Sequence, residues 1–549
     1  MLVFASIAAL ILAAPQDVTP AAAVDAIFKA YDTRTSPGCA VAVFQDDNVL
    51  YKRAYGMANL DHDVPLTSST VFHVASVSKQ FTASAILLLA QDGKLSLDDD
   101  IRKHIPELPD FGRTITIRQL ANHTSGIRDQ WDLLGLAGWR YSRDLITDDD
   151  VLELLTRQKA LNFTPGSRHL YSNSGYTLLA VIVSRVSGKS FRAFTTERIF
   201  EPLGMTHTHF RDTFNEIVKN QAYGYSPFGQ TFRLSVTNFD TAGATSLLTT
   251  VEDMAKWYAN FDSGKVGGAK FVPALLEKGV LNDGETIPYA LGITHGTYRG
   301  LPLVGHGGSD AGYRADFVRF TNPRLGVATL CNISTANPAI LSRKTAEVFL
   351  PAGSLAAETE AKPDAAAEVP LPKDQLARYA GLYWSESDVA ERRIALDGDR
   401  LQAILGGSQR VPLKSLGAGT FVMTAAPFTR LTFVETAGTA VQLKMPGVQT
   451  PLTRMEPFTP AAEQLAEYGG VYRSDEMDAV FRFSVKDGRL QLARSKLRPA
   501  ALDPMFRDTF RAPAGIFQFS RDAAGRIDGF VLQGGRVRHV KFSKDIMAR

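Results

Sequence analysis

Apolar and polar residues alternate in different ways along the chain, and these patterns divide it into segments. Residues 24–352 mix apolar strand-like runs with apolar helical stretches, and the strand-like runs gather towards both ends. Residues 353–372 are rich in Ala, Glu, Pro and Lys without an apolar period, which is typical of a linker. Beyond them, short runs that alternate between apolar and polar residues predict β-strands.

The first segment carries strand signals at its two ends and helix signals between them. Residues 39–53 read as two strands joined by a turn, and further strands are predicted at 301–308, 313–320 and 325–331. A helix at about 339–350 closes the segment. We therefore predict an α/β (α+β) domain in which strands from both ends form one mixed antiparallel sheet, with a helical insert facing it.

The C-terminal part of the chain is an internal repeat. The stretch Leu376-Ala-Arg-Tyr-Ala-Gly-Leu-Tyr383 returns 89 residues later as Leu465-Ala-Glu-Tyr-Gly-Gly-Val-Tyr472. Repeats of this kind mark two copies of one domain, which we place at 373–459 and 460–549. Their alternating pattern and Asp-Gly turns predict two small antiparallel, lipocalin-like barrels, because closure removes free strand edges.

Composition and charge exclude several classes of function. The chain has 549 residues, which is more than one hydrophobic core usually holds, so several domains are expected. Sixty Lys and Arg face 57 Asp and Glu, and the net charge of +3 is spread without a long run of one sign. We therefore expect no nucleic-acid partner.

The N-terminus resembles a secretory leader. Residues 2–14 form an apolar run that is too short to span a bilayer, and Ala21 to Ala23 offer small residues for cleavage. No Lys or Arg precedes the run, which departs from a standard signal. We predict a signal peptide at 1–23 and export to the periplasm or medium, with no integral membrane segment after processing.

The two cysteines are far apart in the chain. Cys39 and Cys331 each lie in an apolar strand-like run. Such a pair is neither a disulfide framework nor a metal site. We expect two buried thiols on neighbouring strands, with a disulfide between them as the alternative.

A Ser-x-x-Lys motif stands at the start of an apolar helix. In Ser76-Val-Ser-Lys79 the two outer residues share a helix face, so the lysine can reach the serine hydroxyl. We expect Ser76 in the first helical turn, where unpaired N–H groups favour negative charge. A serine hydroxyl is a weak nucleophile unless a base lies within hydrogen-bond reach.

Two further motifs follow in order, Tyr171-Ser-Asn173 and His306-Gly-Gly308. Together with the Ser-x-x-Lys motif they resemble the serine β-lactamase and penicillin-binding superfamily, in the class C-like branch that includes D-aminopeptidases, D-amino-acid amidases and carboxylesterases. The resemblance covers residues 24–352. The two C-terminal repeats are similar to the pair of barrel domains carried by D-aminopeptidases of this branch.

The resemblance implies roles for these residues. Ser76 would form the acyl-enzyme, and either Lys79 or Tyr171 would be the base; each needs a pKa lowered far below about 10. The backbone N–H groups of Ser76 and Ser309 would form the oxyanion hole. Asn173 would hold the substrate amide. No cofactor or metal is expected.

The histidine of the third motif departs from the superfamily's usual pattern. β-Lactamases and transpeptidases usually carry Lys-Thr-Gly at this place. A histidine here resembles D-aminopeptidases and some esterases. His306 is largely uncharged at neutral pH and is a poor fixed clamp for a carboxylate. Gly307 and Gly308 are expected to let a ligand approach the strand closely. The alternative is that His306 is a strand residue without substrate contact.

The sequence therefore predicts a serine hydrolase that acts on small amides or peptides, as a D-aminopeptidase does. The alternatives are a carboxylesterase, a DD-carboxypeptidase or β-lactamase-like enzyme, and a non-catalytic ligand-binding sensor. The expected partner is a small-molecule or peptide substrate. The barrels are either passive supports or supply a wall of the active site, for which residues 495–504 are the candidate loop.

Overall fold

The computed structural model describes residues 19–357, 367–405, 409–425, 429–435 and 441–545. Most of the predicted leader, residues 1–18, lies outside the described residues, so the signal peptide stays a prediction. Among the described residues, no helix has both the length and the apolar character that a membrane span requires.

The central sheet joins the two ends of the first segment, as predicted. Its six strands run in the order β12-β13-β14-β15-β1-β2, and each pair of neighbours is antiparallel. The strands are β1 (Cys39–Gln45), β2 (Asn48–Tyr55), β12 (Thr294–Tyr298), β13 (Leu301–Asp310), β14 (Tyr313–Phe320) and β15 (Leu325–Cys331).

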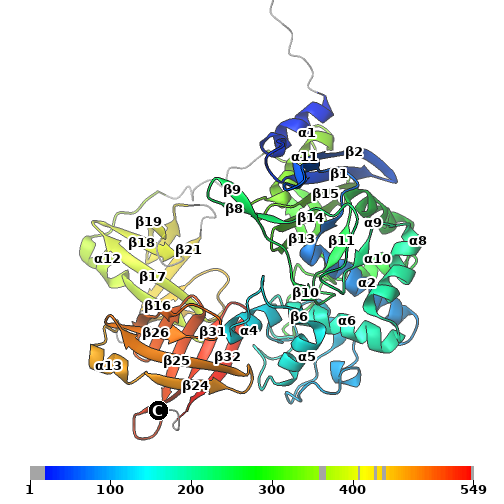
Figure 1. The fold of residues 1–549 in the computed structure, drawn as a ribbon. Helices are drawn as coiled ribbons and strands as arrows, with labels where there is room; N and C mark the ends of the chain where they lie inside the picture. Colours follow the sequence, from blue (N-terminus) through cyan, green and yellow to red (C-terminus); the bar gives the residue numbers. More distant parts are fainter. Residues whose placement is uncertain (1–18, 358–366, 406–408, 426–428, 436–440, 546–549) are drawn as a thin grey trace, which may run out of the picture.

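Helices cover both faces of this sheet (Figure 1). The terminal helices α1 (Pro20–Phe28) and α11 (Pro338–Phe349) pack together on one face, and α9 (Val251–Ser263) packs on the other. Side chains of β1 alternate between the two cores: Ala40 and Ala42 join one, and Val41 joins the other. Burial on both faces explains why β1 is apolar throughout.

The helical insert is built around α2 (Ser78–Gln91), which is buried along nearly its whole length and packs against α6 (Asn173–Ser187). The other helices are α3 (Ile117–Ala121), α4 (Gln130–Ala137), α5 (Asp148–Thr156), α7 (Phe191–Thr195), α8 (Glu201–Leu203) and α10 (Phe271–Leu275). Short strands border the insert: β3 (Met57–Asn59), β4 (Val64–Pro65), β5 (Phe72–His73), β6 (Ile146–Thr147), β7 (His209–Phe210), β8 (Tyr225–Phe228), β9 (Thr231–Leu234), β10 (Phe239–Asp240) and β11 (Leu247–Thr249).

The expectation of two free thiols was wrong, because Cys39 and Cys331 form a disulfide. In the antiparallel register of β1 with β15 the two cysteines are direct partners, and their Cα atoms lie 4.0 Å apart. The apolar runs predicted neighbouring strands, but only the register places the two sulfur atoms against each other.

The C-terminal repeat forms two antiparallel barrels (Figure 1). The first is closed and comprises β16 (Gly381–Ser385), β17 (Ala390–Asp397), β18 (Arg400–Leu405), β19 (Gln409–Gly417), β20 (Thr420–Met423), β21 (Arg430–Glu435), β22 (Val441–Lys444) and β23 (Leu452–Met455). The second is a nine-stranded, nearly closed sheet of β24 (Gly470–Ser474), β25 (Ala479–Lys486), β26 (Arg489–Ala493), β27 (Ala500–Ala501), β28 (Asp503–Phe506), β29 (Thr509–Ala512), β30 (Gly515–Arg521), β31 (Ile527–Gly534) and β32 (Val537–Lys544).

The repeat in the sequence is a repeat in structure. A short helix precedes each barrel, α12 (Lys373–Tyr379) and α13 (Ala462–Ala466), and their first residues are 89 positions apart, as are those of β16 and β24. In each copy a buried tyrosine of the first strand, Tyr383 or Tyr472, donates a hydrogen bond of 2.9 Å to a backbone carbonyl four residues earlier.

Candidate active site

Ser76 lies in a tight turn between strand β5 and helix α2. The turn, Ala75–Val77, is a 3-10 helix, and α2 begins only at Ser78, so Ser76 precedes the α-helix instead of opening it. Ala75 has a left-handed backbone with φ of +48°. Ser78 Oγ fixes this geometry because it donates to Ala75 O at 2.5 Å and accepts from Leu247 N at 3.1 Å.

Lys79 is completely buried beneath the Ser76 hydroxyl. Its Nζ lies 3.1 Å from Ser76 Oγ, 2.9 Å from Asn173 Oδ1 and 2.6 Å from the carbonyl oxygen of Ala244. Burial lowers the pKa of Lys79 to about 7; the carboxylate of Asp129 opposes this shift, and the positive charge of Arg536 adds to it. The amine is therefore available as a base near neutral pH.

Asn173 is the first residue of α6, and its amide is held in one orientation. Its Nδ2 and its backbone N both donate to Asp129 Oδ2, at 2.9 and 2.7 Å, while its Oδ1 accepts from Lys79. Asp129 is completely buried and caps α4 by accepting from two backbone N–H groups. Sequence reasoning missed Asp129, although an aspartate just before an apolar helix is a recognisable cap.

The Tyr171 ring lies over the Lys79 amine, with 4.9 Å between Nζ and the ring centroid. Burial raises the pKa of Tyr171 well above its ordinary value, and a side-chain hydrogen bond with Ser76 offsets only part of this rise. The phenol is therefore neutral at physiological pH. His123 positions this residue: its ring packs on Tyr171 at 4.1 Å between centroids, and its Nδ1 accepts from Ser172 N.

His306 faces the same space from strand β13. Its Nε2 lies 2.9 Å from the hydroxyl of Tyr289 and its Nδ1 lies 2.6 Å from Gly307 O, a pattern that suits a neutral ring with the proton on Nδ1. Burial, and then the charge of Lys79, lower the pKa of His306 to about 4. The ring is therefore uncharged at neutral pH, which agrees with the expectation from the sequence.

The two glycines after His306 differ in what they make possible. A Cβ on Gly308 would lie 2.2 Å from the carbonyl oxygen of Val74, so this glycine lets β13 pack against the Ser76 turn. A Cβ on Gly307 would have only one neighbour, Ala315 O at 3.8 Å. The backbone of Val74, and not a ligand, therefore makes the close approach that Gly308 permits. At Gly307 the strand remains open to the cavity.

Two cavities meet at Ser76, Tyr171 and Ser309. One, of about 310 Å³, is also lined by Asn173 and Arg536; the other, of about 580 Å³, is also lined by His306 and both glycines. With Lys79 beneath Ser76, the structure gathers all eight residues selected from the sequence. Trp131, Tyr141, Thr245, Asp310 and Arg314 were not selected and also line these cavities.

Arg536 is the residue that sequence reasoning had least chance of finding. It lies in the turn between β31 and β32 of the second barrel, and its Nη1 is 3.4 Å from Asp129 Oδ2. None of the described residues of the candidate loop, 495–504, lines either cavity at Ser76. That loop packs farther out, where Lys496 pairs with Asp144 at 3.5 Å.

Comparison with known proteins places this site in a family. Residues 24–349 match the protein family described as Beta-lactamase. The chain belongs to the beta-lactamase family. This confirms the predicted superfamily and fold, and with them an enzyme of the β-lactamase-related serine hydrolase type. Among the described residues, no group of three or more His, Cys, Asp or Glu side chains is placed to hold a metal.

Matches between this beta-lactamase family member and its relatives extend beyond residues 24–349. A D-aminopeptidase of Gluconobacter oxydans (strain 621H) is 27% identical over 447 residues, which is 80% of this chain and 80% of the relative. A D-aminopeptidase of Brucella anthropi is 26% identical over 528 residues, 92% of this chain and 95% of the relative. The solved octameric penicillin-binding protein homologue from Pyrococcus abyssi is 25% identical with a TM-score of 0.53, over 77% of this chain and 96% of that chain.

Proposed function

We propose that this protein hydrolyses small amides or peptides through an acyl-enzyme on Ser76, with a D-aminopeptidase-like preference. Similarity to the two D-aminopeptidases supports the substrate class, because the Brucella relative aligns over nearly the whole length of both chains. The observation that carries the mechanism is the buried Lys79 amine, 3.1 Å from Ser76 Oγ and with a pKa of about 7.

We assign the role of base to Lys79. A neutral amine has two N–H donors and one lone pair; Asn173 Oδ1 and Ala244 O can take the donors, which leaves the lone pair for the Ser76 hydroxyl. Tyr171 would need a lowered pKa to serve as a phenolate base, and burial raises it. The phenol is better suited to pass a proton between Lys79 and the leaving group.

The proposed reaction has two balanced halves. Lys79 takes the Ser76 proton while Oγ bonds to the substrate carbonyl carbon, and the oxyanion is held by the backbone N–H groups of Ser76 and Ser309. The carbon–nitrogen bond then breaks, and the amine leaves with the proton from Lys79, relayed by Tyr171. Water next attacks the ester, gives its proton to Lys79, and Ser76 leaves with that proton.

The neutral His306 supports an aminopeptidase over a carboxypeptidase. An enzyme that binds a substrate carboxylate at this strand profits from a permanent cation, and the pKa of about 4 denies one to His306. Asn173, fixed by Asp129, would hold the substrate amide instead. The sensor alternative has little support, because a binding protein has no use for an amine held against a serine hydroxyl.

A rate comparison tests the proposal. We expect kcat/KM to be highest for D-alanyl p-nitroanilide among D- and L-alanyl anilides, p-nitrophenyl acetate, a cephalosporin and a D-Ala-D-Ala peptide. Ser76→Ala should lower it by about 10³-fold or more, as loss of a nucleophile does. Ser387→Ala on the first barrel is the matched control. Full turnover in Ser76→Ala, or a preference for the ester alone, would reject the proposal.

We also propose that the protein is exported. The disulfide between Cys39 and Cys331 supports this, because disulfides persist in oxidising compartments and are rare in the cytosol of mesophiles. Fractionation of the native host, with a thiol-labelling assay of both cysteines, tests it. Two free thiols in a cytosolic fraction would contradict the proposal.

A further inference from the structure

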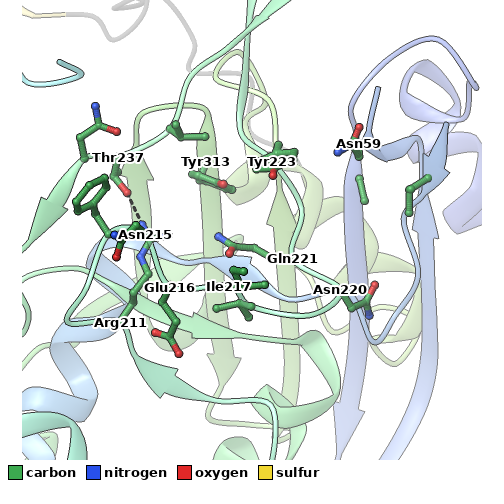
Figure 2. Close-up of a pocket in the computed structure, with 16 residues that line it drawn as sticks. Asn59, Arg211, Asn215, Glu216, Ile217, Asn220, Gln221, Tyr223, Thr237 and Tyr313 are labelled. Atoms are coloured by element: carbon green, nitrogen blue, oxygen red, sulfur yellow. Dashed lines mark hydrogen bonds between the residues drawn. The ribbon is translucent and has the colours of Figure 1, made fainter. Parts of the chain in front are cut away.

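A third cavity, separate from the two at Ser76, is lined in part by Tyr313. It encloses about 510 Å³, a size that suits a small ligand, and it shares no lining residue with the cavities at Ser76. Its wall is made by residues 211–221, by residues 236–238 and by the paired strands β3, which ends at Asn59, and β4 (Figure 2).

Arg211 is the cationic group of this wall. Its side chain is buried, with 7% of the residue exposed, and its Nη2 donates to Thr237 Oγ1 at 2.7 Å. Its Nε has no hydrogen-bond partner among the described residues. The charge of Arg211 attracts the carboxylates of Asp310 and Glu216, but none of the described carboxylates forms a direct ion pair with it. A guanidinium so far from water is costly unless an anion compensates it.

The one carboxylate in the same wall is already engaged. Glu216 receives both Nη atoms of Arg192 at 2.8 Å each, in a two-pronged ion pair. It therefore acts on Arg211 only through space, without a direct ion pair. Its charge would also repel a ligand that carries two negative charges, so the cavity favours a single one.

The rest of the wall is uncharged and mixes carboxamides with apolar and aromatic side chains. The carboxamides of Asn59, Asn215 and Gln221 line the same cavity as Arg211 (Figure 2). Ile217, which is 94% exposed, adds apolar surface. Carboxamides both donate and accept hydrogen bonds, which suits a ligand with amide groups of its own.

We propose that this cavity binds a small monocarboxylate that carries neutral amide groups, with its carboxylate held by Arg211 and Thr237. A planar guanidinium binds a carboxylate through two parallel hydrogen bonds, and burial strengthens the attraction. The site does not depend on the chemistry assigned to Ser76, and it lies apart from the predicted substrate position.

Thermal melting of the full chain tests this site. The probe is N-acetyl-glycyl-glycine, the matched neutral compound is its C-terminal amide, and every variant also carries Ser76→Ala so that neither is turned over. At about 20 mM we expect the acid to raise Tm by about 2 °C or more and the amide to leave it unchanged. Inorganic phosphate should give a smaller rise than the acid.

The variants separate Arg211 from the arginines near Ser76. Arg211→Met should abolish the rise, Arg211→Lys should keep part of it, and Arg314→Gln, in the cavity at Ser76, should keep all of it. Each rise is measured against the melting point of the same variant without ligand, because Arg211→Met also loses the hydrogen bond to Thr237. An equal rise with the amide, with phosphate or in Arg211→Met, or no rise at all, would overturn the proposal.

Discussion

The two barrels share one ancestral pattern but contact the hydrolase domain differently. In each barrel the turn after the first strand presents an acid to an arginine of that domain. In the second barrel, Glu476 Oε2 meets Arg128 Nη1 at 2.6 Å with the side chains 5% and 0% exposed. In the first, Asp388 Oδ1 meets Arg168 Nη1 at 2.9 Å, and the arginine is 32% exposed.

The hairpin turns near the ends of the barrels differ more. The turn between β31 and β32 places Arg536 in the cavity at Ser76. The turn between β22 and β23 lines another cavity, of about 420 Å³, against Arg168, and not the cavities at Ser76. The two barrels thus share a core but differ in their turns, and among the described residues only the second barrel contributes a residue to the cavities at Ser76.

Removing the buried acid of the second barrel should have the largest effect. Glu476→Ala leaves Arg128 buried without its carboxylate, and we expect a loss of about 3–5 kcal/mol in the free energy of unfolding. Chemical denaturation of the full chain measures it. Glu463→Ala, on the exposed start of α13, is the control and should change little.

A double variant sharpens this test. Arg128→Met with Glu476→Leu removes both charges, and it should recover much of the loss because no uncompensated charge remains. A single Glu476→Ala variant that loses less than about 1 kcal/mol would show that the pair is worth no more than an exposed one.

The second effect concerns pH and comes from Arg536. If Lys79 is the base, activity rises with pH through about 7, because only the deprotonated amine accepts the Ser76 proton. The charge of Arg536 helps to lower that pKa, so Arg536→Gln should move the rise to higher pH. At pH 7 we expect kcat/KM to fall about threefold to tenfold.

The first barrel supplies the control for this profile. Arg168→Gln changes a contact with the other repeat, and its pH profile should match that of the parent. If the pH profile of Arg536→Gln matched that of the parent, Arg536 would line the cavity without lowering the pKa of Lys79. The second barrel would then have no more effect on the pH dependence of catalysis than the first.

Local patterns in the sequence predicted most of the fold and the residues of the three motifs, but not the side chains that hold and charge them. Alternating strands and the repeat were readable because their signals lie within a few residues, and Ser76 and Lys79 share a turn. Asp129, Arg536 and the Cys39–Cys331 bond were not readable in the same way. They depend on register and on contacts between segments that are distant in the sequence, for example 44 residues between Asp129 and Asn173 and 292 between the two cysteines, which single-chain periodicity does not encode.

The smallest effect is expected at the exposed pair of the first barrel. Arg168→Gln removes an arginine that is 32% exposed, so solvent already screens its attraction to Asp388. We expect a loss of at most about 1 kcal/mol in unfolding free energy, and the difference from the parent should shrink as salt is added. Denaturation at low and high salt, beside Glu476→Ala, measures both pairs in one series. A loss equal to that of Glu476→Ala would mean that the two barrels dock equally firmly, and that exposure does not separate their contacts.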